Sequence, residues 1–493
     1  MLIAKRLIHV KSNRSSVSIV GSGPSGFYTA YHLLNKSRIP LDITIWEKLP
    51  TPFGLSRYGV APDHPEVKNC EKTFTAIANK FSGNVDPKMH SFRFIGNVTV
   101  GKDVPLKSLL DNQDVVVLSY GCGADKKLRI PGEEGTRGVF TSRQFVNWYN
   151  GHPEFSDNAI LNEFDWSNVR KVGIIGNGNV SLDIARLLVS AQVGEIWNKT
   201  DINPNALRLL RTAPIEDVRL IARRDFLHSK FTNKELREIW ELERYGIQGL
   251  IEERYFNPSR WDLSTADRGL KRRIQMCEEY MKPFHERKGK SYTKYPPPAE
   301  GYSKRVVFDY LKSPIRINKD QHGVIKSITV CKNSLTPTKK VFHHIEDTIE
   351  YDVDLLITSL GYRGEMLPEF TDLNIKFDNN RIVNDRGQVL DTTSNPISGL
   401  FTSGWINKGS TGVIMNTMNN SFEVGDNIIN YLTELPTTLH KLRTPDDIVL
   451  CGTKATTWSD WLKMDSVEKE RAINGQPRQK LLTVAEMLSH VCK

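Results

Sequence analysis

The sequence predicts an α/β fold built from two similar nucleotide-binding units. An apolar run that breaks into closely spaced glycines occurs twice, as VSIVGSGPSGFYTA at 17–30 and as KVGIIGNGNVSLDIA at 171–185. Each run opens a strand, turn, helix and strand pattern, which is typical of Rossmann-like domains. With 493 residues, 39% apolar and 25% charged, the chain is long enough for two or three globular domains.

The first unit consists of an expected strand at 17–20, an amphipathic helix at 26–35 and a second strand at 43–47. Its turn carries Gly21, Gly23 and Gly26 at GxGxxG spacing. The first glycine allows the tight turn, the second lets a pyrophosphate approach the backbone, and the third lets the helix pack closely on the strand. The phosphates would face the free N–H groups of the helix N-terminus.

The ribose-binding residue of the first unit is expected to be Glu47, which ends the second strand 21 residues beyond Gly26. A carboxylate at this place accepts hydrogen bonds from ribose hydroxyls and repels a 2′-phosphate. The first unit is therefore predicted to bind FAD or NAD and to exclude NADP.

The second unit keeps Gly176 and Gly178, but Ser181 replaces the third glycine. Its closing strand, at 218–222, ends in Arg223 and Arg224. Guanidinium groups offer forked donors suited to a phosphate, so this unit is predicted to bind NADPH.

The spacing within the second unit is unusual. The distance in sequence from Ser181 to Arg223 is about twice the usual length, so residues 190–217 are expected to form an insertion or an extended helix. Asp183 and Arg186 fall on the helix that precedes this stretch.

Two later segments complete the pattern of a flavoprotein. DVDLLITSLGYRG at 352–364 predicts a buried strand that ends in a glycine turn, and GLFTSGWINKGSTGVI at 399–414 predicts a short strand, a loop and a helix start near Thr411. Trp405 can pack beside a flavin ring, and three backbone amides can face its carbonyl edge. These amides belong to Gly412, Val413 and Ile414.

Charge and cysteine usage narrow the function further. The net charge is +10 and the pI about 9.1, which suits an acidic partner or a solvated basic surface. The six cysteines form no CxxC pair and no metal-ligand spacing, so we expect no metal site and no redox dithiol. No apolar stretch is long enough to span a bilayer, which leaves at most peripheral membrane association.

The first fourteen residues, MLIAKRLIHVKSNR, contain four basic residues, and no acidic residue occurs before Asp42. Such a start is similar to a short mitochondrial presequence, although a basic terminus without a targeting role is the alternative.

The chain resembles the mitochondrial NADPH:adrenodoxin (ferredoxin) reductases, a flavoprotein family related in fold to glutathione reductase. Among the matching motifs, FGLSRYGVAPDHPEVKN at 53–69 is especially characteristic. The others are GSGPSGFYTA, GNVTVGKDV, GNGNVSLDIARLL, ARRDFLHSKFTNKELRE, GWINKGSTGVI and WSDWLKMDSVEKERAINGQPRQK. The resemblance implies a discontinuous FAD domain with an inserted NADPH domain. The expected boundaries are 15–113 and 366–493 for the FAD domain and 114–365 for the NADPH domain, with the strand DVVVLSYG at 114–121 open to either domain.

The resemblance also implies the cofactor contacts. Those to FAD are Gly21, Gly23, Ser25, Gly26, Glu47, Leu55, Val100, Trp405, Gly412, Val413 and Ile414. Ser25 stands where the family usually has alanine. Those to NADPH are Asn177, Gly178, Asn179, Val180, Arg223, Arg224, Glu235 and Gly412.

No catalytic acid or base is assigned, because hydride transfer to a flavin needs positioning above all. Asp63 and His64 lie in the family's motif near the flavin, so they are expected to be positioning or electrostatic groups. A histidine that only anchors its loop is the alternative.

The resemblance implies an acidic [2Fe–2S] ferredoxin as the electron acceptor and a location in the mitochondrial matrix. Iron–sulfur cluster assembly, haem modification and sterol oxidation are the pathways it could supply. A flavin can release its two electrons singly, and a basic surface would steer an acidic partner. The expected docking residues are Arg268, Lys271, Arg272 and Arg273, with a solvated helix face as the alternative.

Three other classes of protein stay open at this point. Electron-input modules like those of glutamate synthase share the paired nucleotide motifs but usually carry cysteine-rich cluster segments. The second class is a nucleotide-binding sensor without enzymatic activity, and the intact motifs at both nucleotide sites and at Trp405 count against it. A nucleic-acid-binding protein is disfavoured, because the positive charge is dispersed and no recognition motif occurs. The stretch at 286–305, rich in lysine and proline, predicts an exposed loop without an assigned role.

Overall fold

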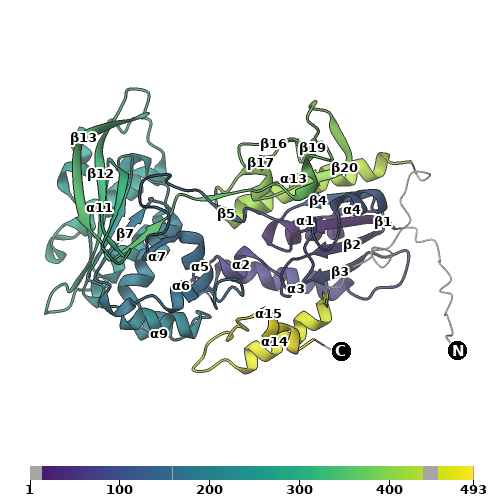
Figure 1. Cartoon of the computed structure of the whole chain (residues 1–493), viewed down its shortest axis with the longest axis horizontal. Coiled ribbons are helices and arrows are strands. Elements are labelled where there is room, and N and C mark those ends of the chain that lie inside the picture. Colours follow the sequence, from purple (N-terminus) through teal and green to yellow (C-terminus); the bar gives the residue numbers. More distant parts are fainter. Residues whose placement is uncertain (1–13, 158, 437–453, 492–493) are drawn as a thin grey trace.

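The computed structural model describes residues 14–157, 159–436 and 454–491. The expected presequence, residues 1–14, lies outside the described residues except for Arg14. The chain forms two α/β bodies that lie side by side (Figure 1). The first body contains both the N-terminal and the C-terminal parts of the described chain, and the second body contains the middle.

The first body is built on an eight-stranded sheet in the order β18-β19-β20-β4-β1-β2-β3-β21. The five strands from β20 to β3 are parallel, and the three central ones, β4, β1 and β2, are almost fully buried, which suits their high apolar content. The strands are β1 (Ser15–Val20), β2 (Leu41–Trp46), β3 (Ser91–Gly96), β4 (Val115–Leu118), β18 (Asn384–Asp385), β19 (Gln388–Leu390), β20 (Pro396–Thr402) and β21 (Thr456–Thr457). A small hairpin, β16 (Phe377–Asp378) and β17 (Arg381–Ile382), lies apart from this sheet.

Helices cover this sheet, and α1 packs most extensively on α13. The aromatic core beneath them joins Phe27, Phe53 and Phe74 to Trp458 and Trp461, so the C-terminal segment is part of the first body. The helices are α1 (Pro24–Lys36), α2 (Leu55–Tyr58), α3 (Cys70–Phe81), α4 (Leu106–Asn112), α12 (Trp405–Lys408), α13 (Ile414–Glu434), α14 (Trp458–Glu470) and α15 (Val484–Ser489).

The second body contains a six-stranded parallel sheet in the order β6-β14-β7-β8-β10-β9. Its strands are β6 (Val139–Thr141), β7 (Lys171–Ile175), β8 (Asp217–Ile221), β9 (Ile247–Ile251), β10 (Lys304–Asp309) and β14 (Leu355–Thr358). An antiparallel sheet of β11 (Lys312–Lys319), β12 (Ile325–Leu335) and β13 (Val341–Asp352) lies beside it. The helices are α5 (Ser142–Tyr149), α6 (Ala159–Asn162), α7 (Asn179–Ser190), α8 (Gly194–Trp197), α9 (Pro204–Thr212), α10 (Asn233–Trp240) and α11 (Arg268–Met281).

Two stretches of the second body, 190–217 and 286–305, were singled out in the sequence. The stretch 190–217 is an insertion that holds two short helices, α8 and α9, in place of one extended helix. Residues 287–303 contain no regular helix or strand and are mostly exposed, as predicted for the loop. Its first residue, Arg287, is buried and pairs with both carboxylate oxygens of Glu243 at 2.5 and 2.8 Å.

The predicted boundary at residue 114 does not match the sheet pairing. Strand β4 pairs with β1 and β20 in the first sheet, with Val17 opposite Val115. The apolar run of β4 would suit either buried sheet, and only its pairing partner decides between them. The chain crosses between the bodies just after β4, at β5 (Ala124–Asp125), and returns at β15 (Tyr362–Arg363). These two strands pair with each other.

The α/β prediction with two strand–turn–helix–strand units is thus confirmed, and the glycines of the first turn show the packing expected of them. Gly21 has a φ of +102°, and a Cβ there would lie 2.7 Å from the Ser119 carbonyl oxygen. A Cβ on Gly26 would lie 2.0 Å from the Gly21 carbonyl oxygen, whereas one on Gly23 would meet no atom within 4 Å. The turn therefore has one open face, at Gly23.

We expect Gly26→Ala to lower the free energy of unfolding by roughly 1–3 kcal/mol, the usual cost of forcing extra volume into a packed site. Gly23→Ala is the matched control and should leave stability nearly unchanged, because its methyl group would project into open space. Urea unfolding of the two variants tests this. Equal stability of both variants would show that the helix can shift to accept a side chain at Gly26.

Candidate active site

A cavity of about 400 Å³ lies at the carboxyl ends of the parallel strands of the first sheet, where α/β proteins bind their ligands. Most of the residues predicted to contact FAD line it. They are Gly21, Gly23, Ser25, Glu47, Leu55, Val100, Trp405 and Ile414. Gly26 lies beneath the turn against Gly21, while Gly412 and Val413 are exposed residues just before α13 and do not line the cavity.

The Glu47 side chain is buried and held in one orientation at the end of β2. Its Oε2 accepts hydrogen bonds from the Ser22 backbone N–H at 3.0 Å and the Ser22 hydroxyl at 2.6 Å, and its Oε1 accepts one from the Leu49 N–H at 3.0 Å. An ionised carboxylate accepts about four hydrogen bonds, so these three leave room for a ligand hydroxyl. Ser25, in contrast, directs its hydroxyl to those of Ser403 and Ser421, at 2.7 and 3.1 Å.

Aromatic side chains from both bodies flank this cavity, and of these the sequence singled out Trp405 alone. Tyr362 and Trp405 have ring centroids 5.8 Å apart, and Tyr58 contacts His152 edge to face at 4.9 Å. Such walls suit a planar ring system. Tyr58 could have been found from the characteristic segment 53–69, and Tyr362 from the strand and turn at 352–364, but His152 carries no local signal.

The second unit forms an open turn between β7 and α7. A Cβ on Gly178 would meet no atom within 4 Å, so the backbone there is accessible, as at Gly23. Asn179 accepts a hydrogen bond from the Thr232 N–H at 2.8 Å. The Asn177 Oδ1 is buried and has no hydrogen-bond partner among the described residues, so this turn presents an unused acceptor. Val180 packs partly against the core of the second body.

Charged side chains surround this turn. Arg223 is exposed and Arg224 half-buried just after β8, and neither forms an ion pair with any residue in the described ranges. The buried Oε2 of Glu235, on α10, likewise lacks a hydrogen-bond partner in the described part of the chain. These groups are available to a ligand, and two adjacent guanidinium groups suit a phosphate.

The expected positioning residues Asp63 and His64 belong to a buried network that joins the two bodies. Arg186, on α7, donates two hydrogen bonds to Asp63 at 2.7 and 3.0 Å. The same guanidinium pairs with Asp183 at 3.0 Å and with Glu238 of α10 at 3.0 Å. His64 Nε2 lies 2.7 Å from the Glu238 carboxylate. Glu238 was not predicted, although it ends the matching motif at 222–238.

The pKa values in this network follow from burial and charge together. Burial acts to raise the pKa of Asp63, but Arg186 outweighs it and holds this pKa below the usual range. Burial acts to lower the pKa of His64, but the hydrogen bond to Glu238 and the nearby charges of Asp63 and Asp183 together outweigh it, so this pKa is raised. For Asp183, burial prevails over the attraction of Arg186 and raises the pKa to about 6.

The segment 53–69 therefore connects the first cavity with the second body. Leu55 and Tyr58, at its beginning, line the first cavity. Three later residues pair with the second body: Asp63 with Arg186, Glu66 with Lys234, and Lys68 with Asp201. This double role gives a structural reason for the distinctive sequence of the segment.

A second cavity, of about 970 Å³, lies between the bodies beside this network. His64, Lys68, Arg186, Glu238 and Arg244 are among its lining residues. It contains both acidic and basic side chains, several of which are exposed to solvent. We call it the interbody cleft.

The basic residues predicted for docking are not equivalent. Arg268, Lys271 and Arg272 are exposed on α11. Arg273 is half-buried and donates to Asn233 Oδ1 and to the carbonyl oxygens of Ser229 and Phe231 at 2.8 to 3.2 Å. Arg273 thus holds the loop before α10 in place, and of the four the three exposed residues, Arg268, Lys271 and Arg272, can present their charge to a partner.

The His64 contact should stabilise the fold in a pH-dependent way. Because its pKa is raised, the stabilisation is fully present below the ordinary histidine pKa of about 6.5 and is lost as the pH rises through the folded-state value. The groups that face His64 are Glu238, Arg186, Asp63 and Asp183. We expect the native protein to exceed His64→Gln in urea midpoint at pH 6, with the difference narrowing toward alkaline pH.

His285→Gln is the control for this measurement, since the His285 side chain is 81% exposed. A difference between native protein and His64→Gln that is constant with pH would mean that His64 only fills space.

Known proteins resemble this chain over nearly all its length. Residues 19–86 match the model of an NAD(P)-binding Rossmann-like domain. The chain is 55% identical to the probable mitochondrial NADPH:adrenodoxin oxidoreductase of Saccharomyces cerevisiae over 98% of both chains, and 36% identical to the mitochondrial NADPH:adrenodoxin oxidoreductase of Homo sapiens over 96% of this chain and 91% of that one.

Among solved structures, FprA of Mycobacterium tuberculosis in complex with NADPH superposes with a TM-score of 0.81 at 31% identity, covering 97% of this chain and 99% of that one. In the described ranges of our structure, no helix is both long and apolar enough to cross a membrane. With its motifs, its fold and these identities in agreement, the chain belongs to the NADPH:adrenodoxin oxidoreductase family.

Proposed function

We propose that this protein is an FAD-dependent NADPH:ferredoxin oxidoreductase that passes electrons one at a time to an acidic [2Fe–2S] ferredoxin of the adrenodoxin type. The observation that carries the proposal is the opposite chemistry of the two nucleotide sites. A fixed carboxylate, Glu47, follows the second strand of the first unit. Two guanidinium groups that form no ion pair within the described residues, Arg223 and Arg224, follow the corresponding strand of the second. The relatives' names, which specify NADPH and adrenodoxin, support it.

The first cavity fits FAD on three grounds. The open turn at Gly23 would accept the pyrophosphate, Glu47 would accept a ribose hydroxyl, and the aromatic walls at Tyr58 and Trp405 would flank the ring. The rest of the cavity wall includes Leu55, Val100 and Ile414. Bound FAD would supply the hydride acceptor for NADPH and the capacity to release the two electrons singly. The chain itself binds, orients and shields the reactants.

The second turn fits NADPH. Gly178 leaves space for the pyrophosphate, the unused Asn177 Oδ1 would accept a ligand hydrogen, and Arg223 with Arg224 would bind the 2′-phosphate. Gly412, expected to touch both cofactors, stays a prediction. The network of Asp63, His64, Arg186 and Glu238 fixes the angle between the bodies that hold the two cofactors, so we assign Asp63 and His64 a positioning role.

We place the protein in the mitochondrial matrix, with at most peripheral contact to the inner membrane, because the relatives' names include that organelle. The FAD domain would comprise the first body and the NADPH domain the second, with the crossing at β5 and β15. The ferredoxin would dock over the interbody cleft, steered by the net charge of +10 and by Arg268, Lys271 and Arg272. Its reduction would serve iron–sulfur, haem or sterol chemistry.

Replacing both Arg223 and Arg224 by Gln should raise the KM for NADPH at least about tenfold and leave that for NADH nearly unchanged. Each charge-assisted hydrogen bond contributes roughly 1.5–3 kcal/mol, and NADH has no 2′-phosphate to lose one. Steady-state ferricyanide reduction with each nucleotide measures this. Arg381→Gln, at an exposed arginine of the first body, is the control. An equal rise for both nucleotides would contradict the 2′-phosphate assignment.

Removing the charges of Arg268, Lys271 and Arg272 together should slow reduction of an adrenodoxin-type ferredoxin at low salt by about tenfold, because rim charges mainly set the association rate. Ferricyanide reduction should be spared. Neutralising Lys102, Arg381 and Arg386, all exposed on the first body, controls for net charge. A ferredoxin rate that stays native would remove α11 from the docking surface.

A further inference from the structure

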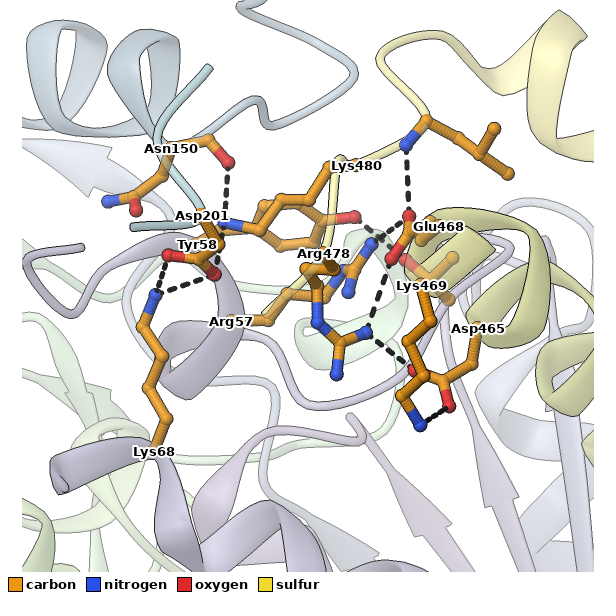
Figure 2. A network of polar contacts seen from close by, with 12 residues as sticks. Arg57, Tyr58, Lys68, Asn150, Asp201, Asp465, Glu468, Lys469, Arg478 and Lys480 are labelled. Carbon is orange, nitrogen blue, oxygen red and sulfur yellow. Dashed lines mark hydrogen bonds and ion pairs between the residues drawn. The ribbon is translucent and has the colours of Figure 1, made fainter. Parts of the chain in front are cut away.

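The C-terminal segment contributes a separate set of ion pairs between the bodies (Figure 2). The Lys480 ammonium group lies 3.0 Å from the Asp201 carboxylate and donates to the Asn150 carbonyl oxygen at 3.0 Å. Lys68, from the first body, donates to both oxygens of Asp201 at 2.6 and 2.8 Å. The Lys480 side chain is 1% exposed and that of Asp201 is 6% exposed, so this contact is shielded from water.

The segment that carries Lys480 is itself fixed to the first body. Glu468, on α14, pairs with Arg57, lies 3.2 Å from Arg478 and accepts a hydrogen bond from the Leu481 N–H at 2.9 Å. Arg478 also pairs with Asp465 at 2.6 Å. Figure 2 shows these groups beside the Lys480–Asp201 contact. Lys480 therefore reaches from a rigid anchor on one body to Asp201 and Asn150 of the other.

This contact lies directly behind the wall of the first cavity. The Lys480 ammonium is 5.9 Å and the Arg57 guanidinium 5.1 Å from the centre of the Tyr58 ring. Tyr58 lines that cavity and packs against His152, which belongs to the second body. Asp201 and Lys68 line the interbody cleft. A shift at Lys480 would thus move the second body relative to Tyr58 and the wall of the first cavity.

The charges of Lys480, Asp201 and Lys68 favour one fixed arrangement of the two bodies more than they add to the stability of the interface. Burial acts to raise the pKa of Asp201, but Lys480 and Lys68 outweigh it, so the carboxylate is ionised. Burial lowers the pKa of Lys480 to about 7, and its nitrogen can donate to Asp201 and to the Asn150 carbonyl whether charged or neutral. Buried ion pairs often add little stability compared with apolar packing, yet they tolerate only one arrangement of their partners.

We propose that Lys480 is a positioning residue for hydride transfer: through Asp201 and Asn150 it fixes the second body at the angle that brings the nicotinamide of NADPH onto the flavin. The proposal rests on the proposed function for the identity of the two cofactors. Neither Lys480 nor Asp201 lines the first cavity, so the effect is on alignment and not on FAD binding. Hydride transfer needs the reacting atoms within about 3.5 Å, and a misplacement of about 1 Å can cost a hundredfold in rate.

Lys480→Met is the test variant, because it keeps the methylene packing and leaves Asp201 paired with Lys68. The FAD-loaded variant is mixed anaerobically with increasing NADPH in a stopped-flow instrument. We expect the limiting rate of flavin bleaching to fall about 10- to 100-fold. FAD content and the Kd for NADPH should change by less than about twofold, since neither site is touched. The long-wavelength charge-transfer absorbance, which reports stacking of nicotinamide on flavin, should also fall.

Lys463→Met is the matched control, because Lys463 lies on the same C-terminal segment but pairs with Asp460 inside the first body. It should keep the native rate and absorbance. A native limiting rate and native charge-transfer absorbance in Lys480→Met would overturn the proposal. If Lys480→Met does not retain FAD, Asp201→Asn is used, which keeps the shape of the side chain and removes its charge. A native rate in that variant overturns the proposal as well.

Failure of the proposed function is distinguishable from failure of this inference. If NADPH does not bleach the flavin of the native protein, the proposed function is refuted, but the inference about Lys480 is not. The interface is then measured directly by small-angle X-ray scattering of native protein and Lys480→Met. A larger radius of gyration in the variant supports the positioning role of Lys480, and identical scattering refutes it.

Discussion

The arrangement of the molecule depends on the buried guanidinium of Arg186, which carboxylates from both bodies hold. Asp63 reaches it from the first body, and Asp183 and Glu238 from the second. Removing one partner of such a buried pair typically costs about 3–5 kcal/mol, because the remaining charge stays out of water without compensation. The interface therefore has one strongly preferred geometry, and the segment 53–69 transmits it to the wall of the first cavity through Tyr58.

The two nucleotide sites use one backbone plan for two chemistries. Both turns have an open glycine, Gly23 or Gly178, where a side chain would meet nothing. They differ in the side chains at the end of the next strand. One site has a carboxylate already held by Ser22 and Leu49, and the other has two adjacent guanidinium groups without an ion-pair partner in the part of the chain that the structure describes. Selectivity thus depends on single side chains at the strand ends, while binding of the pyrophosphate depends on the backbone.

Two sets of ion pairs between the bodies include residues that line the interbody cleft. One is the Arg186 network, and the other is the contact of Asp201 with Lys68 and Lys480. A body held by both sets cannot rotate freely about either one. This constraint suits a protein whose chemistry needs two bound cofactors at a fixed separation.

The sequence by itself determined the fold class, the two glycine turns and the contrast between Glu47 and the arginine pair. These features depend on spacings of a few residues, which a strand–turn–helix unit translates directly into positions in space. Most of the residues expected at the first site line one cavity for the same reason.

Only the tertiary structure decided which sheet strand β4 joins, that Arg273 is engaged within its own body, and that Gly412 and Val413 lie outside the first cavity. It alone brought Glu238 to His64 and Lys480 to Asp201, across 174 residues in the first pair. Such pairings leave no periodic signal in the chain. Burial selects them, because a charged group withdrawn from water must find its partner wherever the fold places one.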